Sequence, residues 1–472
     1  MRLTVEGRGP LHGVVRVPGD KSISHRALLL GAIADGPTHV AGFLPAADCL
    51  ATLACVRQLG VEVDCIGNTE LLVHGRGLRG LRQAAGPLDC GGSATTMRLL
   101  AGILAGQPYL SMLTGNEQLK RRPMERVADP LRKMGASVWC GECGGRAMPL
   151  TIRGGDLRGI DYQLPVASAQ LKSAILLAGL YAEGPTTVRE PSATRDHTER
   201  MLAAYGASLE AEERRVTLQP AGGLRSMDIC VPGDLSSAAF LIVAACLVPD
   251  SQITIQAVNV NPTRTGLLDV LMAMGADLRL DNLENIAGPA YRERLDATDC
   301  GLEGRKDSQP AFAGGEPVAD VIGRAPAGGH HPYLQGSELR GALVPRMIDE
   351  FPILAVAATQ AEGRTVVRDA SELRVKETDR INSIVGELVK MGADIEEQPD
   401  GFVVSGPTRL QGARVDCHAD HRLAMSLAIA GLLAEGTTTI EGADCIGDSF
   451  PGFEQVLSTL TGCQDRPLHI AS

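Results

Sequence analysis

The sequence lacks the features that mark several classes of protein. Aromatic residues are scarce, with one Trp, six Tyr and seven Phe among 472 residues, so base stacking is not an expected activity. No apolar run approaches the ~20 residues that cross a membrane, and the N-terminal MRLTVEGRGP has no signal-peptide core. A net charge of −11 disfavours binding to nucleic acid or to anionic membranes. These absences favour a soluble, cytoplasmic enzyme with small-molecule substrates and with neither nucleic-acid nor membrane partners.

The cysteines show no framework of disulfides. Most of the twelve stand singly, which is typical of a reduced cytosolic protein. Cys140 and Cys143 have the spacing of a zinc pair, but no second pair lies near them in the sequence, so we expect two thiols and no bound metal. The sequence holds no evidence on the oligomeric state, and a monomer is our expectation.

Two series of repeats decide the fold class. In the first, a run of small and aliphatic residues ends at a Gly or Pro turn and continues as a β-type stretch. In the second, a helix-like segment closes on Gly before a strand, as in RKMGASV. Six units of roughly 70 residues exceed the period of a short solenoid and indicate a duplicated α/β protein, with ordinary α/β layering as the alternative. The first series comprises 28–40, 100–112, 175–188, 240–255, 354–367 and 426–440, and the second comprises 57–63, 132–138, 203–209, 272–278, 389–395 and, more weakly, 459–465.

Glycine accounts for the turns, and composition accounts for the expected burial. A glycine after the last helical residue takes the left-handed conformation at little cost, and the Thr, Val and Ile residues that follow prefer a sheet. The helices before the turns are apolar on almost every face, as in AAFLIVAACLV at 238–248, so we expect them inside. Helices buried among strands reverse the arrangement of an ordinary barrel.

The length of the chain and one long interval between repeats suggest how it is divided. The chain exceeds the usual size of one hydrophobic core, so we expect two domains. The interval between the turns at Pro249 and Gly363 is longer than the others by about 40 residues, which lie between Asp281 and Arg340 in polar, Gly/Pro-rich text. We interpret them as a mobile surface insertion rather than a functional lid, because no cluster of acid, base and cation stands there.

Cationic residues cluster in the segments that connect successive repeats. The segment GDKSISHR places Lys21, Ser22 and Arg26 before a helix that we expect to begin near Ala27, and such residues at a helix start favour an anion. It is not a P-loop, because Asp20 stands where that loop has glycine. A capped surface helix with solvated charges is the alternative. GGSATTMR at 91–98 is a second Gly/Ser/Thr-rich start of a helix and would suit an anion equally. KRRP at 120–123 is a cluster of three cations, for which a charged surface is the usual explanation.

The densest group of charges lies in the second half of the chain. RMIDE at 346–350 leads into an apolar helix, RVKETDR at 374–380 interleaves cations with acids, and HADHR at 418–422 stands at another helix start. Groups this close form either a structural ion network or a site that handles a proton beside a bound anion. Their recurrence at equivalent joints favours a cleft that holds more than one phosphate or carboxylate and keeps carboxylates for acid–base work.

These motifs resemble those of the 5-enolpyruvylshikimate-3-phosphate synthase (EPSP synthase) family. GDKSISHRALLLGA, PVASAQLKSAILLAGL, RDHTERML, PGDLSSAAF, RVKETDR and DHRLAMS stand in the family's order, and the resemblance covers the chain except near 285–335. PVASAQ, RDHTERML and SFPGF are more similar to the glyphosate-tolerant bacterial class than to the plant and enteric class.

The resemblance implies a two-domain inside-out α/β barrel with six βαβαββ repeats, three in each domain. One domain would comprise 1–19 and 233–472, carry the acid and base residues and contain the insertion near 285–335. The other, 20–232, would carry most contacts to shikimate 3-phosphate, with the active site in the cleft between the domains. Closure of the domains would exclude water.

The family's reaction transfers the enolpyruvyl group of phosphoenolpyruvate to the 5-hydroxyl of shikimate 3-phosphate and releases phosphate. It runs through a tetrahedral intermediate, serves chorismate and aromatic amino-acid biosynthesis, and needs no metal or organic cofactor. By resemblance, Glu377 would be the acid, Asp349 the base with Lys376 as a helper, and Lys21 a further catalytic residue. The shikimate 3-phosphate residues would be Lys21, Ser22, Arg26, Ser168, Ala169, Gln170, Thr194, Arg195, Asp349 and Lys376. The phosphoenolpyruvate residues would be Lys21, Gly92, Ala94, Arg122, Gln170, Arg380, His421 and Arg422.

Four positions depart from the family's pattern. Gly92 replaces the Asn of GNAGT, and Ala94 replaces a glycine that lies against the inhibitor glyphosate. The added methyl group would crowd a ligand longer than phosphoenolpyruvate, which implies tolerance. Glu372 stands where the plant and enteric class has Asn, and Asp448 where it has a phosphate-binding lysine. The lost cation implies a weaker phosphoenolpyruvate site or compensation by a neighbour.

Two alternatives remain at this stage. The sister enolpyruvyl transferase that acts on UDP-N-acetylglucosamine has the same fold, but it carries a reactive cysteine on a mobile loop, and GNEQLKRRPM at 115–124 has none. KSISHR also replaces that enzyme's Lys-Asn start. A non-catalytic binding protein on the same scaffold is suggested only by Gly92 and Asp448, and the retained acid, base and cationic residues argue against it.

Overall fold

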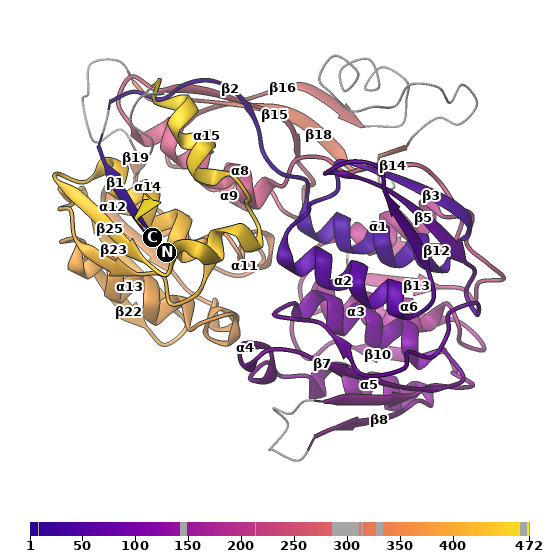
Figure 1. The fold of residues 1–472 in the computed structure, drawn as a ribbon. Helices are drawn as coiled ribbons and strands as arrows, with labels where there is room; N and C mark the ends of the chain where they lie inside the picture. The colour runs from indigo at the N-terminus through magenta and orange to yellow at the C-terminus, as the bar shows by residue number, and fades with distance from the viewer. Residues whose placement is uncertain are drawn as a thin grey trace. The chain divides into compact units, whose positions relative to one another are not determined.

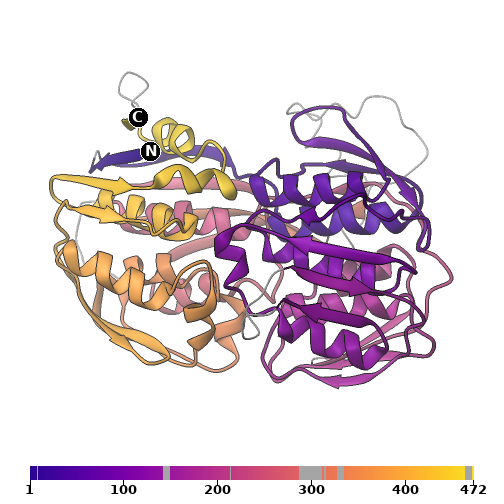
Figure 2. The same ribbon diagram turned by 60° about the horizontal axis from the view of Figure 1, so that its bottom comes forward.

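The chain divides into two compact units. In the computed structural model (Figures 1 and 2), the first unit comprises Met1–Pro18, Gly233–Glu284 and Val318–Ser472, and the second comprises Gly19–Pro232 and Asn285–Pro317. No helix in the described part of the chain is long and apolar enough to cross a membrane. The structure describes residues 1–7, 9–141, 149–212, 214–285, 311–312, 315–326, 334–462 and 470–471.

Three helices that are buried along almost their whole length form the centre of the second unit. They are α1 (Lys21–Ile33), α3 (Ala94–Ala105) and α6 (Ala169–Gly179), and α3 packs against both of the others. The sheets have the strand orders β10-β11-β13-β12, β17-β14-β3-β5-β4 and β6-β7-β9-β8. The other helices are α2 (Ala47–Gln58), α4 (Glu117–Lys120), α5 (Glu125–Met134) and α7 (His197–Ala204). The strands are β3 (Asp35–Ala41), β4 (Glu62–Cys65), β5 (Glu70–Arg76), β6 (Leu88–Asp89), β7 (Leu110–Thr114), β8 (Ser137–Cys140), β9 (Leu150–Arg153), β10 (Asp161–Gln163), β11 (Thr186–Arg189), β12 (Leu209–Glu212), β13 (Arg215–Leu218), β14 (Ile229–Cys230) and β17 (Ala311–Phe312).

The first unit repeats this plan. Its buried helices are α8 (Leu235–Leu247), α12 (Phe351–Thr359) and α14 (His421–Leu433), which pack against one another. The sheets have the orders β24-β25-β1-β26, β16-β18-β15-β2 and β19-β21-β23-β22, and β20 pairs with β21. The other helices are α9 (Gly266–Ala273), α11 (Leu343–Arg346), α13 (Arg380–Lys390) and α15 (Phe453–Leu460), with 3₁₀ turns η1 (Ser371–Val375) and η2 (Ala443–Asp448). The strands are β1 (Arg2–Glu6), β2 (His12–Arg16), β15 (Gln252–Asn259), β16 (Asp277–Asn285), β18 (Pro317–Arg324), β19 (Leu334–Gln335), β20 (Glu338–Leu339), β21 (Ala361–Val367), β22 (Asp394–Gln398), β23 (Gly401–Gly406), β24 (Arg414–Asp416), β25 (Thr437–Glu441) and β26 (Ile470–Ala471).

Both series of repeats are confirmed. Each of the six buried helices runs through a short turn into a strand: β3, β7, β11, β15, β21 and β25 respectively along the chain. All thirteen residues of α8 are buried, and the uninterrupted apolar run at 238–247 predicts this for the last ten of them. In the second series, the helix-ending glycines all have a left-handed φ: Gly60 (85°), Gly135 (114°), Gly206 (88°), Gly275 (102°), Gly392 (86°) and Gly462 (65°).

One glycine of the first series has a different reason for being there. Gly106 ends α3 with φ −86°, so the left-handed conformation expected at this turn is wrong. A Cβ atom on Gly106 would lie 2.1 Å from Cγ of Tyr181. Glycine is therefore required here by the close approach of a buried aromatic ring, and not by backbone conformation.

The insertion expected near 285–335 contains a regular strand. Strand β18 lies between β15 and β16 in its sheet, and its Val318 and Val321 are buried. The prediction was wrong there because the alternating stretch is short and is flanked on both sides by Gly/Pro-rich sequence. Strand β17 pairs in parallel with β14 of the second unit, whereas the sequence placed all of 233–472 in one domain. Within the expected insertion, residues 286–310, 313–314 and 327–333 lie outside the described residues, as does Cys143.

Candidate functional site

The first turns of the buried helices carry the predicted residues of the second unit. Residues 21 and 22 of α1, 95 of α3, and 169 and 170 of α6 are only partly buried, whereas the rest of each helix is buried. Backbone N–H groups of a first helical turn have no partner within the helix and favour an anion. Three helix starts in one unit therefore emerge from the core with polar side chains.

Helix α1 begins at Lys21 and not near Ala27. The side chain of Asp20 accepts a 2.9 Å hydrogen bond from the backbone N of Ile23, which is the geometry of an N-cap. The prediction was wrong because it treated Asp20 only as a departure from a P-loop. Lys21 is thus the first helical residue, and its Nζ lies 3.2 Å from Oδ2 of Asp48 in α2.

Arg26 connects three helices. Its Nε donates to Oγ1 of Thr198 at 2.7 Å, and its Nη2 donates to Oγ of Ser173 at 2.8 Å. Its Nη1 donates to the backbone O of Ser22 at 2.9 Å. Burial, with Arg195 adding to it, lowers the pKa of Arg26 to about 10, against the opposing effect of nearby carboxylates. The guanidinium is therefore a cation at neutral pH, held beneath the starts of α1, α6 and α7.

Hydrogen bonds join the starts of α3 and α6. Ser93 caps α3, with its Oγ accepting from the N of Thr96 at 3.1 Å. Ser168 caps α6 in the same way through the N of Leu171 at 3.4 Å. Gln170 donates from Nε2 to Oγ1 of Thr95 at 2.9 Å and accepts at Oε1 from Nη1 of Arg98 at 2.5 Å. The side-chain amide of Gln170 is thus oriented by α3 from both of its ends.

Asn116 lies beside the position where the family's amide is missing. A Cβ atom on Gly92 would lie 3.2 Å from Nδ2 of Asn116. The backbone N of Asn116 donates to the O of Gly91 at 2.8 Å, so the chain before α4 is fastened to the loop before α3. Arg122 follows α4 in the next turn and is 8% exposed.

Thr194 and Arg195 lie in the segment between β11 and α7. The hydroxyl of Thr194 donates to the carboxylate of Glu190, which directly follows β11. Both Thr194 and Glu190 are buried, whereas Arg195 is partly exposed. The segment that carries two predicted substrate residues is therefore anchored by a buried carboxylate.

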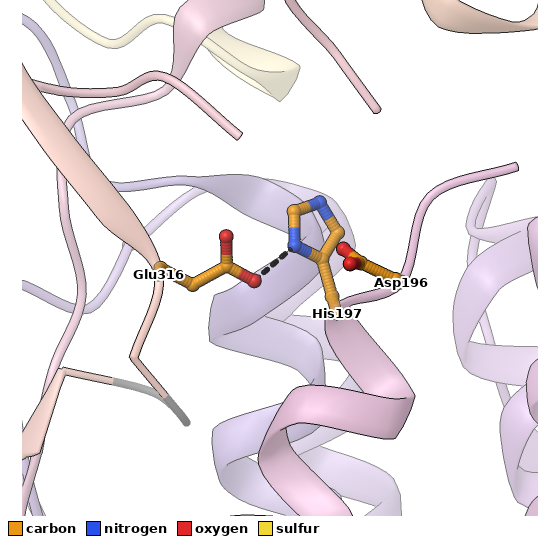
Figure 3. Close-up of side chains that lie close together, drawn as sticks. All are labelled: Asp196, His197 and Glu316. Atoms are coloured by element: carbon orange, nitrogen blue, oxygen red, sulfur yellow. Dashed lines mark hydrogen bonds and ion pairs between the residues drawn. The ribbon is translucent and has the colours of Figure 1, made fainter. Parts of the chain in front are cut away.

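The next residues form a compact polar cluster at the start of α7 (Figure 3). Nδ1 of His197 lies 2.6 Å from Oε1 of Glu316, and both residues are fully buried. Asp196 accepts a 2.8 Å hydrogen bond from Nε of Arg200. Ligand atoms of the three side chains lie within 4.8 Å of one another, and their donor types suit a metal. Since Glu316 is bonded to His197 and Asp196 to Arg200, we interpret the cluster as hydrogen bonds that hold the chain before β18 against α7.

Asp349 is surrounded by three cations in the first unit. Its Oδ1 lies 3.3 Å from Nζ of Lys376 and 3.2 Å from Nη1 of Arg380. Its Oδ2 lies 3.7 Å from Nη2 of Arg422. These residues come from the turn before α12, from the end of η1 and from the starts of α13 and α14. The structure thus brings the predicted base together with its predicted helper and with two predicted phosphoenolpyruvate residues.

Arg380 contacts three carboxylates while only 1% exposed. Its Nη2 donates to Oε2 of Glu377 at 2.6 Å, and its Nε donates to Oδ2 of Asp420 at 2.7 Å. Burial acts to lower the pKa of Arg380, but Asp420, Glu377 and Asp349 outweigh it and raise the pKa above the ordinary value. Arg380 is therefore a permanent cation that orients the carboxylates around it.

Helix α14 supplies the remaining predicted residues. Asp420 is its N-cap and accepts from the N of Arg422 at 2.9 Å, so His421 and Arg422 occupy the first turn. Arg422 also lies near Glu350, with Nη1 3.8 Å from Oε1. Glu350 accepts a 2.5 Å hydrogen bond from the hydroxyl of Ser236, at the start of α8. The starts of the three buried helices thus meet here, as in the second unit.

The two remaining departures from the family's pattern lie in the 3₁₀ turns. Glu372 belongs to η1, and Asp448 is the last residue of η2, which packs against α14. Both side chains are partly buried.

Several residues of these groups were missed by the sequence interpretation. Arg98 orients Gln170, Lys172 is buried beneath the start of α6, and Asp420 caps α14 while binding Arg380. The spacing of Arg98 in the sequence could have revealed it, because Arg98 stands five residues after Ser93 as Arg26 stands five residues after Lys21. Lys172 gave a weaker signal, a single cation within the apolar run QLKSAILLAGL.

Comparisons with known proteins agree over nearly the whole chain. Residues 5–313 and 317–457 match the family described as EPSP synthase (3-phosphoshikimate 1-carboxyvinyltransferase). A protein of Desulforamulus reducens named 3-phosphoshikimate 1-carboxyvinyltransferase is 50% identical over 457 residues, which are 97% of this chain and 99% of that protein. One of the same name from Pelotomaculum thermopropionicum is 50% identical over 448 residues, 95% of this chain and 96% of that one.

Solved structures give the same result for the fold. The structure of EPSP synthase from Acinetobacter baumannii is 42% identical, with a TM-score of 0.81 over 97% of this chain and 98% of that one. The enolpyruvyl transferase NikO from Streptomyces tendae is 19% identical, with a TM-score of 0.74 over 97% of each chain, and at that identity it supports the fold alone.

Proposed function

The chain belongs to the EPSP synthase family, and we propose that it transfers the enolpyruvyl group of phosphoenolpyruvate to the 5-hydroxyl of shikimate 3-phosphate. The observation that carries the proposal is the group around Asp349, where one carboxylate is held by Lys376, Arg380 and Arg422. A carboxylate held among fixed cations suits proton transfer beside bound anions. The two-domain enolpyruvyl transferase fold, with its six repeats, agrees with this activity.

The two units supply different parts of the chemistry. The helix starts of the second unit, with Lys21, Ser22, Arg26 and Gln170 among the assigned residues, bind shikimate 3-phosphate through backbone N–H groups, hydroxyls and cations. Arg380 and Arg422 of the first unit bind phosphoenolpyruvate together with Lys21 and Arg122 of the second. The reaction therefore requires both groups of residues at once, and we propose that the domains close on the substrates in a cleft between them.

The addition step needs one proton delivered and one removed. Glu377 gives a proton to the vinyl carbon of phosphoenolpyruvate, and the 5-hydroxyl oxygen attacks the neighbouring carbon. Asp349, helped by Lys376, accepts the hydroxyl proton, and a tetrahedral intermediate results. Elimination then breaks the carbon–oxygen bond to phosphate and returns a proton from the methyl carbon to the enzyme. The fixed cations stabilise charge on the intermediate and on the departing phosphate.

Phosphate release by the purified protein tests the proposal. Shikimate 3-phosphate and phosphoenolpyruvate are supplied together and then each is omitted, and release that requires both establishes the transferase. Release that requires UDP-N-acetylglucosamine instead of shikimate 3-phosphate would assign the sister reaction. Binding of shikimate 3-phosphate by calorimetry without any release would mean a binding protein, in which Gly92 or Asp448 has disabled the phosphoenolpyruvate part.

Four further expectations stay predictions. Glyphosate tolerance rests on Ala94, whose methyl group would crowd a ligand longer than phosphoenolpyruvate. The monomeric state is tested by sedimentation, and the cytoplasmic location by fractionation of cells that produce the protein. The absence of a metal is tested by elemental analysis of the purified protein and by its activity in the presence of a chelator.

A further inference from the structure

A buried lysine lies directly beneath the proposed shikimate 3-phosphate residues. Lys172 belongs to α6, two positions after Gln170, and is 1% exposed. Its Nζ lies 2.8 Å from Oε2 of Glu190 and 2.6 Å from Oε1 of Glu199. It also donates to the backbone O of Thr194 at 3.4 Å. A lysine buried to this degree is unfavourable unless it is paired, so these contacts account for its presence in an apolar helix.

The charges of this group are interdependent. Burial acts to lower the pKa of Lys172, but Glu199 and Glu190 outweigh it and raise the pKa, so the ammonium keeps its charge. Burial raises the pKa of Glu199, and Lys172 opposes that effect. One cation thus serves two buried carboxylates on different segments of the chain.

A second connection joins α6 and α7, the helices that carry Lys172 and Glu199. Ser173, the neighbour of Lys172, and Thr198, the neighbour of Glu199, have their hydroxyls 2.6 Å apart. Both hydroxyls accept hydrogen bonds from Arg26. The starts of α6 and α7 are therefore joined by a pair of hydroxyls and by an ion pair, one residue apart.

Lys172 and Glu190 also hold the segment between β11 and α7. Glu190 accepts hydrogen bonds from Lys172 and from the hydroxyl of Thr194. The carbonyl of Thr194 accepts from Lys172 as well. The position of Thr194, and of Arg195 after it, therefore depends on the same ammonium as the position of α6.

We propose that Lys172 is a positioning residue for shikimate 3-phosphate, acting through Glu190 and Glu199 and contacting no substrate itself. It fixes the start of α6, the Thr194–Arg195 segment and the start of α7 in the arrangement that binds the phosphorylated ring. The inference rests on the proposed function and adds to it a residue outside the substrate contacts. A residue of this kind changes the affinity for one substrate more than the rate of the chemical step.

Direct binding of shikimate 3-phosphate by calorimetry is the decisive measurement. We expect Lys172→Met to raise its dissociation constant by ~10- to 100-fold, the usual effect of losing hydrogen bonds that involve a charge. The KM for phosphoenolpyruvate at saturating shikimate 3-phosphate should change by less than ~3-fold. Val216→Ala, a truncation in the core of the same unit, serves as control and should lower the melting temperature without changing the dissociation constant.

Two further variants keep the test decisive if Lys172→Met does not fold. Lys172→Met/Glu199→Gln removes one cation and one anion, so the three positions keep the same net charge, and Glu190→Gln changes only one group. Either variant, folded by circular dichroism, should also bind shikimate 3-phosphate at least ~10-fold more weakly. Wild-type affinity in a folded double variant would overturn the positioning role. Phosphate release by the wild type without shikimate 3-phosphate would instead overturn the proposed function, so the two failures are distinguishable.

Discussion

Arg380 donates a 2.6 Å hydrogen bond from Nη2 to Oε2 of Glu377, three residues before it in the chain. Glu377 lies two residues before Asp379, the N-cap of α13, and Arg380 is the first helical residue, so the bond fixes a carboxylate beside the helix start. The same guanidinium binds Asp349 and Asp420. The proposed acid and the proposed base are therefore oriented by one buried cation.

Glu377→Gln tests the assignment of the acid. Glutamine keeps the shape and accepts the hydrogen bond from Arg380, but it has no proton to give to the vinyl carbon. We expect turnover to fall at least ~100-fold, the usual contribution of a general acid, with the KM values changed far less. The measurement is steady-state phosphate release, with Glu396→Gln on the exposed face of β22 as control. Near-normal turnover of Glu377→Gln would remove Glu377 from this role.

Arg98→Met tests whether the orientation of Gln170 matters. Gln170 would keep its hydrogen bond to Thr95 but lose the one at its carbonyl oxygen, so its amide could rotate. We expect KM values for both substrates to rise by ~10-fold, which corresponds to one hydrogen bond to a charged group. Arg189→Met, which removes an exposed arginine paired with Asp161, is the matched control. Unchanged KM values in Arg98→Met would show that Gln170 is held adequately without Arg98.

Glu387 gives a prediction about pH and stability. Its carboxylate accepts from Nζ of Lys390 at 2.7 Å and from the backbone N of Asp416 at 3.0 Å, and it lies 2.8 Å from Nε2 of His418. Burial acts to raise the pKa of Glu387, but these contacts outweigh it and lower the pKa below the ordinary 4.5. The folded state therefore favours the charged carboxylate more strongly than the unfolded state does.

The contribution of Glu387 should be present at neutral pH and disappear in acid. Glu387→Gln is expected to lower the free energy of unfolding at pH 7 by about 1.5–3 kcal/mol, the range for hydrogen bonds to a charged group. The difference from the wild type should shrink as the pH falls below 4.5, because the wild-type carboxylate then takes up a proton and loses the same interactions. Urea unfolding of both proteins between pH 7 and pH 3 measures it. A difference that stays constant over this range would mean that the charge of Glu387 is not the cause.

The parts of the fold that depend on local sequence could be predicted. The glycine-terminated helices and the strands after them follow from residues adjacent in the chain, and the burial of α8 follows from its uninterrupted apolar run at 238–247. The start of α1 was predicted wrongly because an aspartate is compatible both with a loop and with an N-cap. Strand β18 was not predicted because only its pairing with β15 and β16 distinguishes it from the Gly/Pro-rich sequence around it.

Some residues of the candidate site could likewise be predicted from local sequence, and others could not. Residues within motifs, such as Lys21, Asp349 and Glu377, could be proposed from the sequence because their spacing is characteristic of a known family. Lys172 was not found, because its partners Glu190 and Glu199 lie in other elements and only the fold brings the three together. Residues that position a site are hard to recognise from local sequence, because the fold brings their partners from distant parts of the chain.

Ala94 is expected to determine how the protein responds to the inhibitor glyphosate. Ala94 is the first residue of α3, follows the capping Ser93 and is 7% exposed, so its methyl group occupies space at a helix start. Gly92, two positions earlier, has Asn116 beside it, so this loop is already crowded on one side. We expect the wild type to resist micromolar glyphosate at saturating phosphoenolpyruvate, and Ala94→Gly to lower the inhibition constant by at least ~10-fold. The KM for phosphoenolpyruvate should change little, because the shorter ligand does not reach the methyl group. The matched control is Ala105→Gly at the last residue of the same helix, since glycine there has a similar cost to helix stability without touching the loop. Equal inhibition of wild type and Ala94→Gly would mean that the methyl group does not determine the response, and strong inhibition of the wild type would contradict tolerance altogether.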